Sequence, residues 1–388
     1  MHALFHLIGI ASMLLAALGC NFYIAQRLFV PRYGKRGAMI YMISHAIILL
    51  ILTAIGCIAS MGGLADSIAT LVWVMYGFML LYIPRLTYTI VSWVDFLKTP
   101  HGTMGSRVGF VLAAISFCLI VGSTFNRYRI NVEEVEITTP RLPHSFDGYR
   151  IVHFSDMHLE TLYSHTFAQR IVNRINELQP HMIVFSGDLV NRKASELVPY
   201  MPILSQLQAQ DGIYSVMGNH DYGEFVVWPT PEARQENLQS LYRMHTEMGW
   251  HLLNNTSKHI YCNNDSIAIV GVENWGEPPF SQYGNLEAAY PNLNNETFKL
   301  LISHNPRHWR AEVLPKSNID LMMAGHTHAL QMSFAGYSPA LARYPEWGGL
   351  YQEDNQYLYV NIGIGCTMIP TRLGATPEIT VITLHSEQ

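Results

Sequence analysis

Five short polar clusters hold side chains of the kinds that bind metal ions, and each cluster follows an apolar or β-branched run. Carboxylate oxygens and neutral imidazoles suit Mn²⁺, Fe and Zn²⁺, and none of the five clusters contains a cysteine. The clusters are Asp156-Met157-His158, Gly187-Asp188, Gly218-Asn219-His220-Asp221, Ser303-His304 and Gly325-His326-Thr327-His328. A lone Gly-Asp or His-x-His pair is most often a turn or a coincidence, but five clusters in succession predict a metal centre.

Seven of these side chains are candidate metal ligands. Two metal ions that share one ligand need about seven or eight protein donors in all. The seven candidates are Asp156, His158, Asp188, Asn219, His304, His326 and His328. One residue separates Asp156 from His158 and His326 from His328, so in an extended segment the two members of each pair lie on one side. Asp188, in the middle of the set, is the natural bridge between two ions.

The clusters lie in a part of the chain where β-rich runs alternate with helical ones. Strands are predicted at 150–154, 182–186, 213–217, 267–272, 298–302, 320–324, 357–362 and 378–384, and helices at 164–178, 194–209 and 231–248. Strands that alternate with helices predict a layered α/β domain over residues 126–388. Sites in such domains are built at the carboxyl ends of strands, which is where the five clusters fall.

The first 125 residues differ in charge from the rest of the chain. The whole sequence has 24 Lys and Arg against 29 Asp and Glu. Residues 1–125 hold only seven of these basic residues and two of the acidic ones, which leaves 17 basic and 27 acidic residues for 126–388. Nine charges cannot cover the surface of a soluble domain of this length. The acidic remainder lacks the basic footprint of a nucleic-acid binder, so we expect no nucleic acid as a partner.

Four apolar runs in this N-terminal part are long enough to cross a membrane. They occupy about residues 3–26, 38–60, 67–84 and 108–125. A helix needs about 20 residues to cross about 30 Å of hydrocarbon, so we expect a transmembrane domain of four helices over residues 1–125. A buried helical core is the alternative, but the short intervening loops give it no polar exterior. A cleaved signal is the alternative for the first run, but residues 1–20 contain no Lys or Arg.

The basic residues of the loops predict an orientation. The loop after the second run has only Asp66, whereas the other two loops contain Arg27, Arg32, Lys35 and Arg36, and Arg85, Lys98 and Arg107. Positively charged loops stay in the cytoplasm. Both termini, and with them residues 126–388, are therefore expected on the extracytoplasmic face.

Taken together, the five clusters resemble the signature of the calcineurin-like metallophosphoesterases over about residues 150–330. The anchor, Gly218–Tyr222 and the C-terminal Pro370-x-Arg372 resemble the membrane-bound bacterial branch and the similarly built transmembrane proteins of animals. This resemblance implies a four-layer α/β/β/α sandwich and a place in the bacterial inner membrane. One departure is that Ala329 and Leu330 stand where this branch commonly has two glycines, which suggests a less open loop over the metals.

The resemblance also implies a role for each site residue. The two metals are expected to be held by Asp156, His158, Asp188 and His328, and by Asp188, Asn219, His304 and His326. Two cations about 3.5 to 4 Å apart acidify a bridging water and stabilise both oxygens of an in-line displacement at phosphorus. His220 would then be the proton donor to the leaving group, and Asp221 would orient it and keep it protonated. Arg372 is a candidate contact for a substrate phosphate, or else half of a structural ion pair.

We therefore expect a membrane-anchored hydrolase that cleaves phosphate esters through a hydroxide bridging two divalent metals, Mn, Fe or Zn. A tethered enzyme favours a lipid-linked substrate, because tethering raises its local concentration. A pyrophosphatase of a nucleotide-linked lipid, such as UDP-diacylglucosamine in lipid A synthesis, is an alternative that requires the cytoplasmic face. A metal-binding scaffold has no use for a proton donor such as His220, and a transporter needs intramembrane charges that these runs lack.

Overall fold

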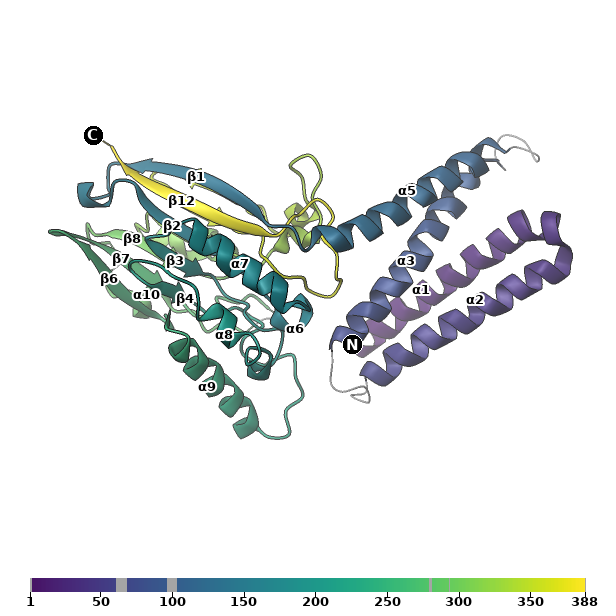
Figure 1. Cartoon of the computed structure of the whole chain (residues 1–388), viewed down its shortest axis with the longest axis horizontal. Helices are drawn as coiled ribbons and strands as arrows, with labels where there is room; N and C mark the ends of the chain where they lie inside the picture. The colour runs from purple at the N-terminus through teal and green to yellow at the C-terminus, as the bar shows by residue number, and fades with distance from the viewer. Residues whose placement is uncertain (1, 61–67, 96–102, 279–280, 293, 388) are drawn as a thin grey trace. The chain divides into compact units, whose positions relative to one another are not determined.

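The computed structural model describes residues 2–60, 68–95, 103–278, 281–292 and 294–387, and Figure 1 shows their helices and strands. Asp66 and Lys98, which entered the charge argument, lie outside the described residues. The chain divides into two units. The N-terminal unit consists of Met1–Phe125 with Met368–Thr371, and the C-terminal unit of Asn126–Thr367 with Arg372–Gln388.

The apolar N-terminal runs form helices, because a helix satisfies the backbone N–H and C=O groups of an apolar segment within that segment. The helices are α1 (His2–Ile24), the π-helix η1 (Ala25–Phe29), α2 (Val30–Ser60), α3 (Ile68–Ser92) and α5 (Met104–Asn126). By length and composition, three stretches of the described residues can cross a membrane: Ala11–Ile58, Thr70–Ser92 and Met104–Asn126. The predicted count of four spans is thus corrected to three candidate spans.

The first candidate span takes in both of the first two predicted runs. It is 48 residues long, about twice what one crossing needs. The helical backbone continues through the basic segment that was expected to be a loop, and only Gly34, with a φ of 65°, leaves the helical region. The Tyr41 hydroxyl of α2 donates to Asn21 Oδ1 of α1 at 3.2 Å, and Figure 1 shows the two helices side by side. The chain therefore turns back within this stretch.

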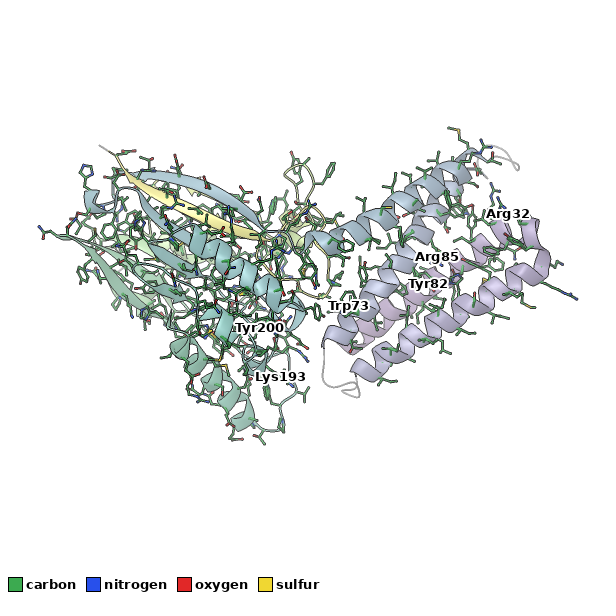
Figure 2. The ribbon with its side chains drawn as sticks, in the orientation of Figure 1. Arg32, Trp73, Tyr82, Arg85, Lys193 and Tyr200 are labelled. Atoms are coloured by element: carbon green, nitrogen blue, oxygen red, sulfur yellow. The ribbon has the colours of Figure 1, made fainter. Side chains whose placement is uncertain are left out.

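The third predicted run does not end at Pro84, because α3 continues to Ser92. Proline removes one backbone hydrogen bond, but membrane helices tolerate it when other groups compensate. Arg85 donates to the Leu81 carbonyl and lies 3.2 Å from Nε2 of His45, and Figure 2 shows Arg85 on the same helix as Trp73 and Tyr82. α5 begins four residues before the predicted run, where the Asp95 carboxylate accepts the backbone N–H groups of Gly105 and Ser106.

The C-terminal unit contains two six-stranded sheets. The strand order of the first sheet is β1 (Asn131–Thr139), β12 (Glu378–Ser386), β2 (Tyr149–Phe154), β3 (Met182–Phe185), β4 (Ile213–Ser215) and β5 (Trp250–Leu252). Strands β2 to β5 are parallel, with Ile151 opposite Met182 and Ile183 opposite Ile213, whereas β12 runs antiparallel to β2. The carboxyl ends of β2, β3 and β4 therefore lie at one edge.

The second sheet also has a parallel centre. Its strand order is β10 (Gly349–Glu353), β11 (Gln356–Val360), β9 (Leu321–Ala324), β8 (Phe298–Ile302), β7 (Asp265–Gly271) and β6 (Thr256–Cys262). The strands from β11 to β7 are parallel, and the outer strands β10 and β6 pair antiparallel to their neighbours. The carboxyl ends of β8 and β9, which precede the histidine clusters, are thus neighbours.

Apolar clusters cover both faces of the central strands. Ile151 and Met182 belong to a buried cluster that takes side chains from both sheets, whereas Val152 and Ile183 belong to a second cluster that includes side chains of α7 (His165–Glu177). A third cluster joins residues of the second sheet to Trp309 and its neighbours. Because successive side chains of a strand face opposite sides, burial of both faces explains why these strands read as continuous apolar runs.

Two of the three predicted helices of this unit form as single helices. They are α7 and α9 (Pro231–Glu247), whose N-terminal caps are Ser164 and Thr230. The predicted helix over 194–209 is wrong, since only η3 (Ala194–Glu196) and α8 (Met201–Leu204) form, and Pro199 and Pro202 cannot donate helical hydrogen bonds. The other short helices are η2 (His144–Phe146), α6 (Leu159–Leu162), α10 (Leu286–Ala289), η4 (Trp309–Val313), α11 (Leu314–Lys316), η5 (His328–Gln331) and η6 (Pro339–Ala342).

Candidate metal centre

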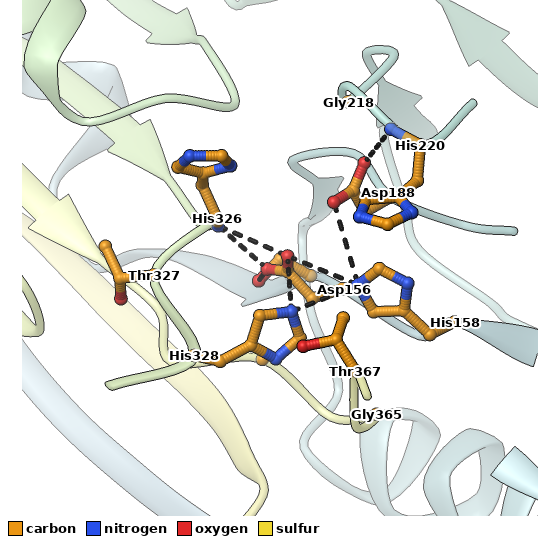
Figure 3. Close-up of polar contacts among 12 residues, drawn as sticks. Asp156, His158, Asp188, Gly218, His220, His326, Thr327, His328, Gly365 and Thr367 are labelled. Carbon is orange, nitrogen blue, oxygen red and sulfur yellow. Dashed lines mark hydrogen bonds and ion pairs between the residues drawn. The ribbon is translucent and has the colours of Figure 1, made fainter. Parts of the chain in front are cut away.

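The five polar clusters follow five strands of the two sheets. Asp156 and His158 follow β2, Asp188 follows β3, Asn219 to Asp221 follow β4, His304 follows β8, and His326 and His328 follow β9. Figure 3 shows Asp156, His158, Asp188 and His328 pointing toward one another from their separate loops. The structure thus brings together six of the seven predicted ligands and His220, because donor atoms of these seven residues fall into three overlapping groups.

One group of donors consists of Asp156, His158 and His328. Nε2 of His328 lies 3.2 Å from Oδ1 of Asp156 and 3.0 Å from Nε2 of His158. One donor atom from each of the three residues lies within 4.8 Å of the others, and all three side chains are buried. Convergence of buried donors at this spacing is what a single bound cation requires.

A second group consists of Asp188, His304 and His326. Nε2 of His304 lies 3.1 Å from Oδ2 of Asp188 and 3.2 Å from Nδ1 of His326. The same Oδ2 of Asp188 is 3.6 Å from Nε2 of His158, which belongs to the first group. One carboxylate oxygen therefore faces both groups, as the bridging position predicted for Asp188 requires.

The side chain of Asn219 indicates that this site fits a metal ion. Its side chain is buried, and Oδ1 has no hydrogen-bond partner among the described residues. A buried polar atom without a partner costs about 1 to 3 kcal/mol, which a bond to a cation would offset. The donor set also has the chemistry of a divalent metal site, because it offers carboxylate oxygens, imidazoles and one amide oxygen.

The pKa shifts of His158, His326 and Asp188 favour the deprotonated forms that bind metal, whereas the shift of His304 favours its protonated form. Burial, with the charge of His220, holds the pKa of His158 well below its ordinary value, and burial with His304 lowers the pKa of His326 to about 3. Burial raises the pKa of Asp188, but the charges of His304 and His220 outweigh burial and hold this pKa well below its usual range. Burial lowers the pKa of His304, but Asp188 outweighs burial and raises it to about 9. A metal must therefore displace a proton from His304 at neutral pH.

Neighbouring groups orient the histidine rings. The backbone carbonyl of Ser186 lies 2.7 Å from Nδ1 of His304, which places the ring proton there and leaves Nε2 for a metal. The Tyr344 hydroxyl lies 3.0 Å from Nε2 of His326, so Nδ1 is the atom that faces His304. Tyr344 was missed in the sequence, because it lies 18 residues after His326 in a segment without a motif.

The structure places Arg372 behind His328. Its side chain is fully buried and donates to the carbonyls of Ile362 and Gly365, each at 2.9 Å from one of its nitrogens. Nη2 also lies 3.1 Å from Nδ1 of His328. Among the described residues Arg372 forms neither of the contacts expected from the sequence, since it has no exposed surface for a phosphate and no carboxylate within ion-pair distance.

His220 is oriented by a backbone carbonyl and not by Asp221. Its Nδ1 lies 2.8 Å from the carbonyl oxygen of Asn191, and its backbone N–H donates to Oδ1 of Asp188 at 2.8 Å. The His220 ring stacks on Phe225, with ring centroids 4.5 Å apart, and also lies within ligand distance of His158 and Asp188. No sequence signal identifies Asn191, because every residue carries a carbonyl.

The Asp221 carboxylate instead ties together the two loops that hold the site. Its oxygens accept backbone N–H groups at 2.9 to 3.1 Å. The donors are those of Asp188, Leu189, Val190 and Gly218. Because one carboxylate serves both loops, Asp221 fixes the backbone of Asp188 relative to that of Gly218.

Replacing Asp221 with alanine is expected to destabilise the C-terminal unit. The change leaves four buried N–H groups without an acceptor, so we expect the free energy of unfolding to fall by about 3 kcal/mol or more. Urea unfolding followed by tryptophan fluorescence measures this loss, with Glu236→Ala on the exposed side of α9 as a matched control. Equal stability of the two variants would show that these four bonds contribute nothing.

The chain belongs to the calcineurin-like phosphoesterase family, whose profile matches residues 149–330. It is 30% identical over 268 residues to YkuE, an uncharacterised metallophosphoesterase of Bacillus subtilis (strain 168), which covers 67% of this chain and 87% of that protein. The resemblance of the five clusters to this family is thereby confirmed.

Other relatives are named as transmembrane proteins. The chain is 30% identical over 260 residues to a transmembrane protein with metallophosphoesterase domain from Danio rerio, which covers 65% of this chain but only 57% of that protein. Together with the apolar helices, this relative indicates a membrane protein. Among solved structures, a phosphopantetheinyl hydrolase from Mycobacterium tuberculosis matches 55% of this chain and 89% of the hydrolase chain. Its sequence identity is 13% and its TM-score is 0.34, so this match supports no functional conclusion.

Proposed function

We propose that this protein is a membrane-anchored hydrolase of phosphoric esters with two divalent metals in one site. The observation that supports it best is the position of Asp188, whose Oδ2 lies 3.6 Å from Nε2 of His158 and 3.1 Å from Nε2 of His304. A carboxylate between two donor groups suits a pair of ions better than one. We further propose that the domains divide at 125/126 and that the three apolar clusters separate four layers, helix, sheet, sheet and helix.

The proposed ligands follow the two donor groups. One metal would be held by Asp156, His158, Asp188 and His328, and the other by Asp188, Asn219, His304 and His326. Bound divalent cations supply Lewis-acid charge, which acidifies water and stabilises the charge that develops on the phosphoryl oxygens. The unpartnered Oδ1 of Asn219 supports its place in the second set.

The chain's own residues would then orient the substrate and move the proton. His220, held through Nδ1 by the Asn191 carbonyl, has Nε2 left to donate a proton to the leaving oxygen. Asp221 acts on the loops and not on this ring, because its carboxylate is already bonded to backbone N–H groups. Arg372 is a positioning residue for His328 and for the C-terminal turn, since it donates to Gly365 and lies beside Nδ1 of His328.

The natural substrate is proposed to be a phosphate ester linked to a lipid in a bacterial inner membrane. The apolar helices and the transmembrane relatives support a membrane location. The basic residues that lie in the described part of the first segment, Arg27 to Arg36, support a cytoplasmic position for that turn. The C-terminal unit would then be extracytoplasmic, and its excess of acidic residues argues against a nucleic-acid substrate.

Metal addition to metal-free protein tests this function. Protein stripped with a chelator is expected to hydrolyse bis(4-nitrophenyl) phosphate or 4-nitrophenyl phosphate only after Mn²⁺, Zn²⁺ or Fe²⁺ is restored. Because Asp188 raises the pKa of His304 to about 9, His304 carries a proton at neutral pH that the metal must displace. The metal concentration for half-maximal activity should therefore fall about tenfold per pH unit between pH 7 and pH 9.

The control is Mg²⁺-free buffer with chelator throughout, in which activity should stay at background. Metal-independent activity, or none with any of the three metals and both esters, would contradict the proposed function. A half-saturating concentration that does not change with pH would contradict the displacement of a proton from His304.

A further inference from the structure

Residues 330–341, which we call the apolar loop, expose several large apolar side chains directly after the metal-ligand candidate His328. The exposed residues are Leu330, Met332, Phe334, Tyr337 and Leu341. Phe334 is 85% exposed and Tyr337 is 72% exposed. Single exposed apolar residues are ordinary in proteins, but five within twelve residues form a contact surface.

The backbone at the start of the apolar loop is strained. His328, Ala329, Leu330 and Gln331 have φ values of 50°, 52°, 47° and 57°, in the left-handed region that favours glycine. Leu330 is nevertheless 56% exposed, so burial within this protein does not offset the strain. A large apolar side chain kept at such a position is explained if it contacts something outside the chain.

The apolar loop and the residues next to it in the sequence have fewer charged side chains than the rest of the unit. Residues 329–345 contain no acidic residue and one basic residue, Arg343. Tyrosine and arginine side chains suit the boundary between headgroups and hydrocarbon, because each joins an apolar body to a polar end. This composition fits a bilayer surface better than it fits water.

Hydrogen bonds connect the apolar loop to the residue at which the membrane helix α5 ends. Nδ2 of Asn126, the last residue of α5, donates to the carbonyl of Arg372 at 2.8 Å. The next residue, Leu373, donates to the Gln331 carbonyl at 2.9 Å and accepts from the Ser333 N–H at 2.8 Å. One side-chain hydrogen bond from Asn126 and the backbone hydrogen bonds of Leu373 therefore link the residue that ends this candidate membrane span to the apolar loop.

We propose that the apolar loop rests on the bilayer surface from which α5 emerges. Its apolar side chains would enter the headgroup boundary, and the metal centre, which the loop directly follows in the chain, would face phosphoesters carried by lipids. The contact with the bilayer stands on the loop alone, whereas the preference for lipid-borne phosphoesters rests on the proposed function.

Photocrosslinking in native membranes tests the contact without requiring activity. The full chain carries p-benzoylphenylalanine in place of Phe334, and a control carries it in place of Tyr261, which is 75% exposed on the outer strand β6. We expect lipid adducts by mass spectrometry at position 334 and at least about tenfold fewer at 261. An adduct to protein, including a second copy of this chain, or equal lipid adducts at both positions, would overturn the proposal.

A matched pair of substrates tests the consequence for turnover. In proteoliposomes, Phe334→Ser combined with Tyr337→Ser should lower kcat/KM for hexadecyl 4-nitrophenyl phosphate about tenfold, because the lipid-borne ester is no longer presented. Turnover of ethyl 4-nitrophenyl phosphate, which has the same leaving group, should stay within about twofold. Equal losses on both esters would contradict the presentation role. If the wild type cleaves neither ester, the proposed function fails, while the crosslinks still decide the bilayer contact.

Discussion

Asp188→Asn is expected to lower kcat/KM for bis(4-nitrophenyl) phosphate by about a thousandfold. Asparagine keeps the shape of the side chain and can still accept the His220 N–H, which now donates to Oδ1 at 2.8 Å. It removes the negative charge from Oδ2, the atom that lies between His158 and His304. Steady-state hydrolysis with saturating Mn²⁺ measures the loss, and metal analysis is expected to show less than the wild-type content.

Asp354→Asn is the matched control for this change. Asp354 is exposed in the turn between β10 and β11, at a φ of 49° that asparagine also adopts. Its activity should stay within about twofold of wild type. Metal-dependent activity in Asp188→Asn equal to that of this control would remove Asp188 from the catalytic site.

His220→Asn is expected to have a large effect that depends on the leaving group. A proton donor matters most when the leaving oxygen is basic, so we expect a loss of about a thousandfold for an alkyl phosphoester. For 4-nitrophenyl esters, whose leaving group departs without a proton, the loss should be about tenfold or less. Comparison of kcat for the two classes of ester in wild type and variant measures the difference.

His259→Asn, on the exposed side of β6, controls for the loss of an imidazole. His220 also lies within ligand distance of His158 and Asp188, so metal content is measured in parallel. An equal loss on both classes of ester, together with loss of a metal ion, would identify His220 as a ligand and not as the proton donor.

The positions of the central strands could be predicted because both of their faces are buried. The runs at 150–154 and 298–302 correspond to β2 (Tyr149–Phe154) and β8 (Phe298–Ile302), in which nearly every side chain is buried. The helix expected over 194–209 failed because apolar spacing was weighed without Pro199 and Pro202. The outer strands β5 (Trp250–Leu252) and β10 (Gly349–Glu353) were missed, since short, partly exposed strands carry a weak apolar signal.

In the membrane helices, the sequence did not predict the backbone structure around the basic residues. Arg27 and Arg32 suggested a loop, yet the helical backbone continues through both of them into α2. Arg27 is accommodated by an ion pair with Asp95 at 2.8 Å, a partner that lies 68 residues away in the chain. Pairing between distant residues cannot be inferred from local charge alone.

The His and Asp side chains that the structure brings together could be predicted from the sequence, but the contacts that support them could not. Each ligand candidate stands at a strand end, where residue type and position together point to metal binding. The contacts of Asp221 and Arg372 are made largely with backbone groups, which leave no trace in the sequence. The sequence therefore predicts which atoms meet at the centre better than it predicts what holds them there.

Anomalous diffraction from crystals grown with Mn²⁺ tests the central claim most directly. We expect two manganese peaks, one bonded to His328 and the other to Oδ1 of Asn219, with Asp188 contacting both. A single peak, or a site in which Oδ1 of Asn219 contacts no metal, would contradict a dinuclear centre bridged by Asp188.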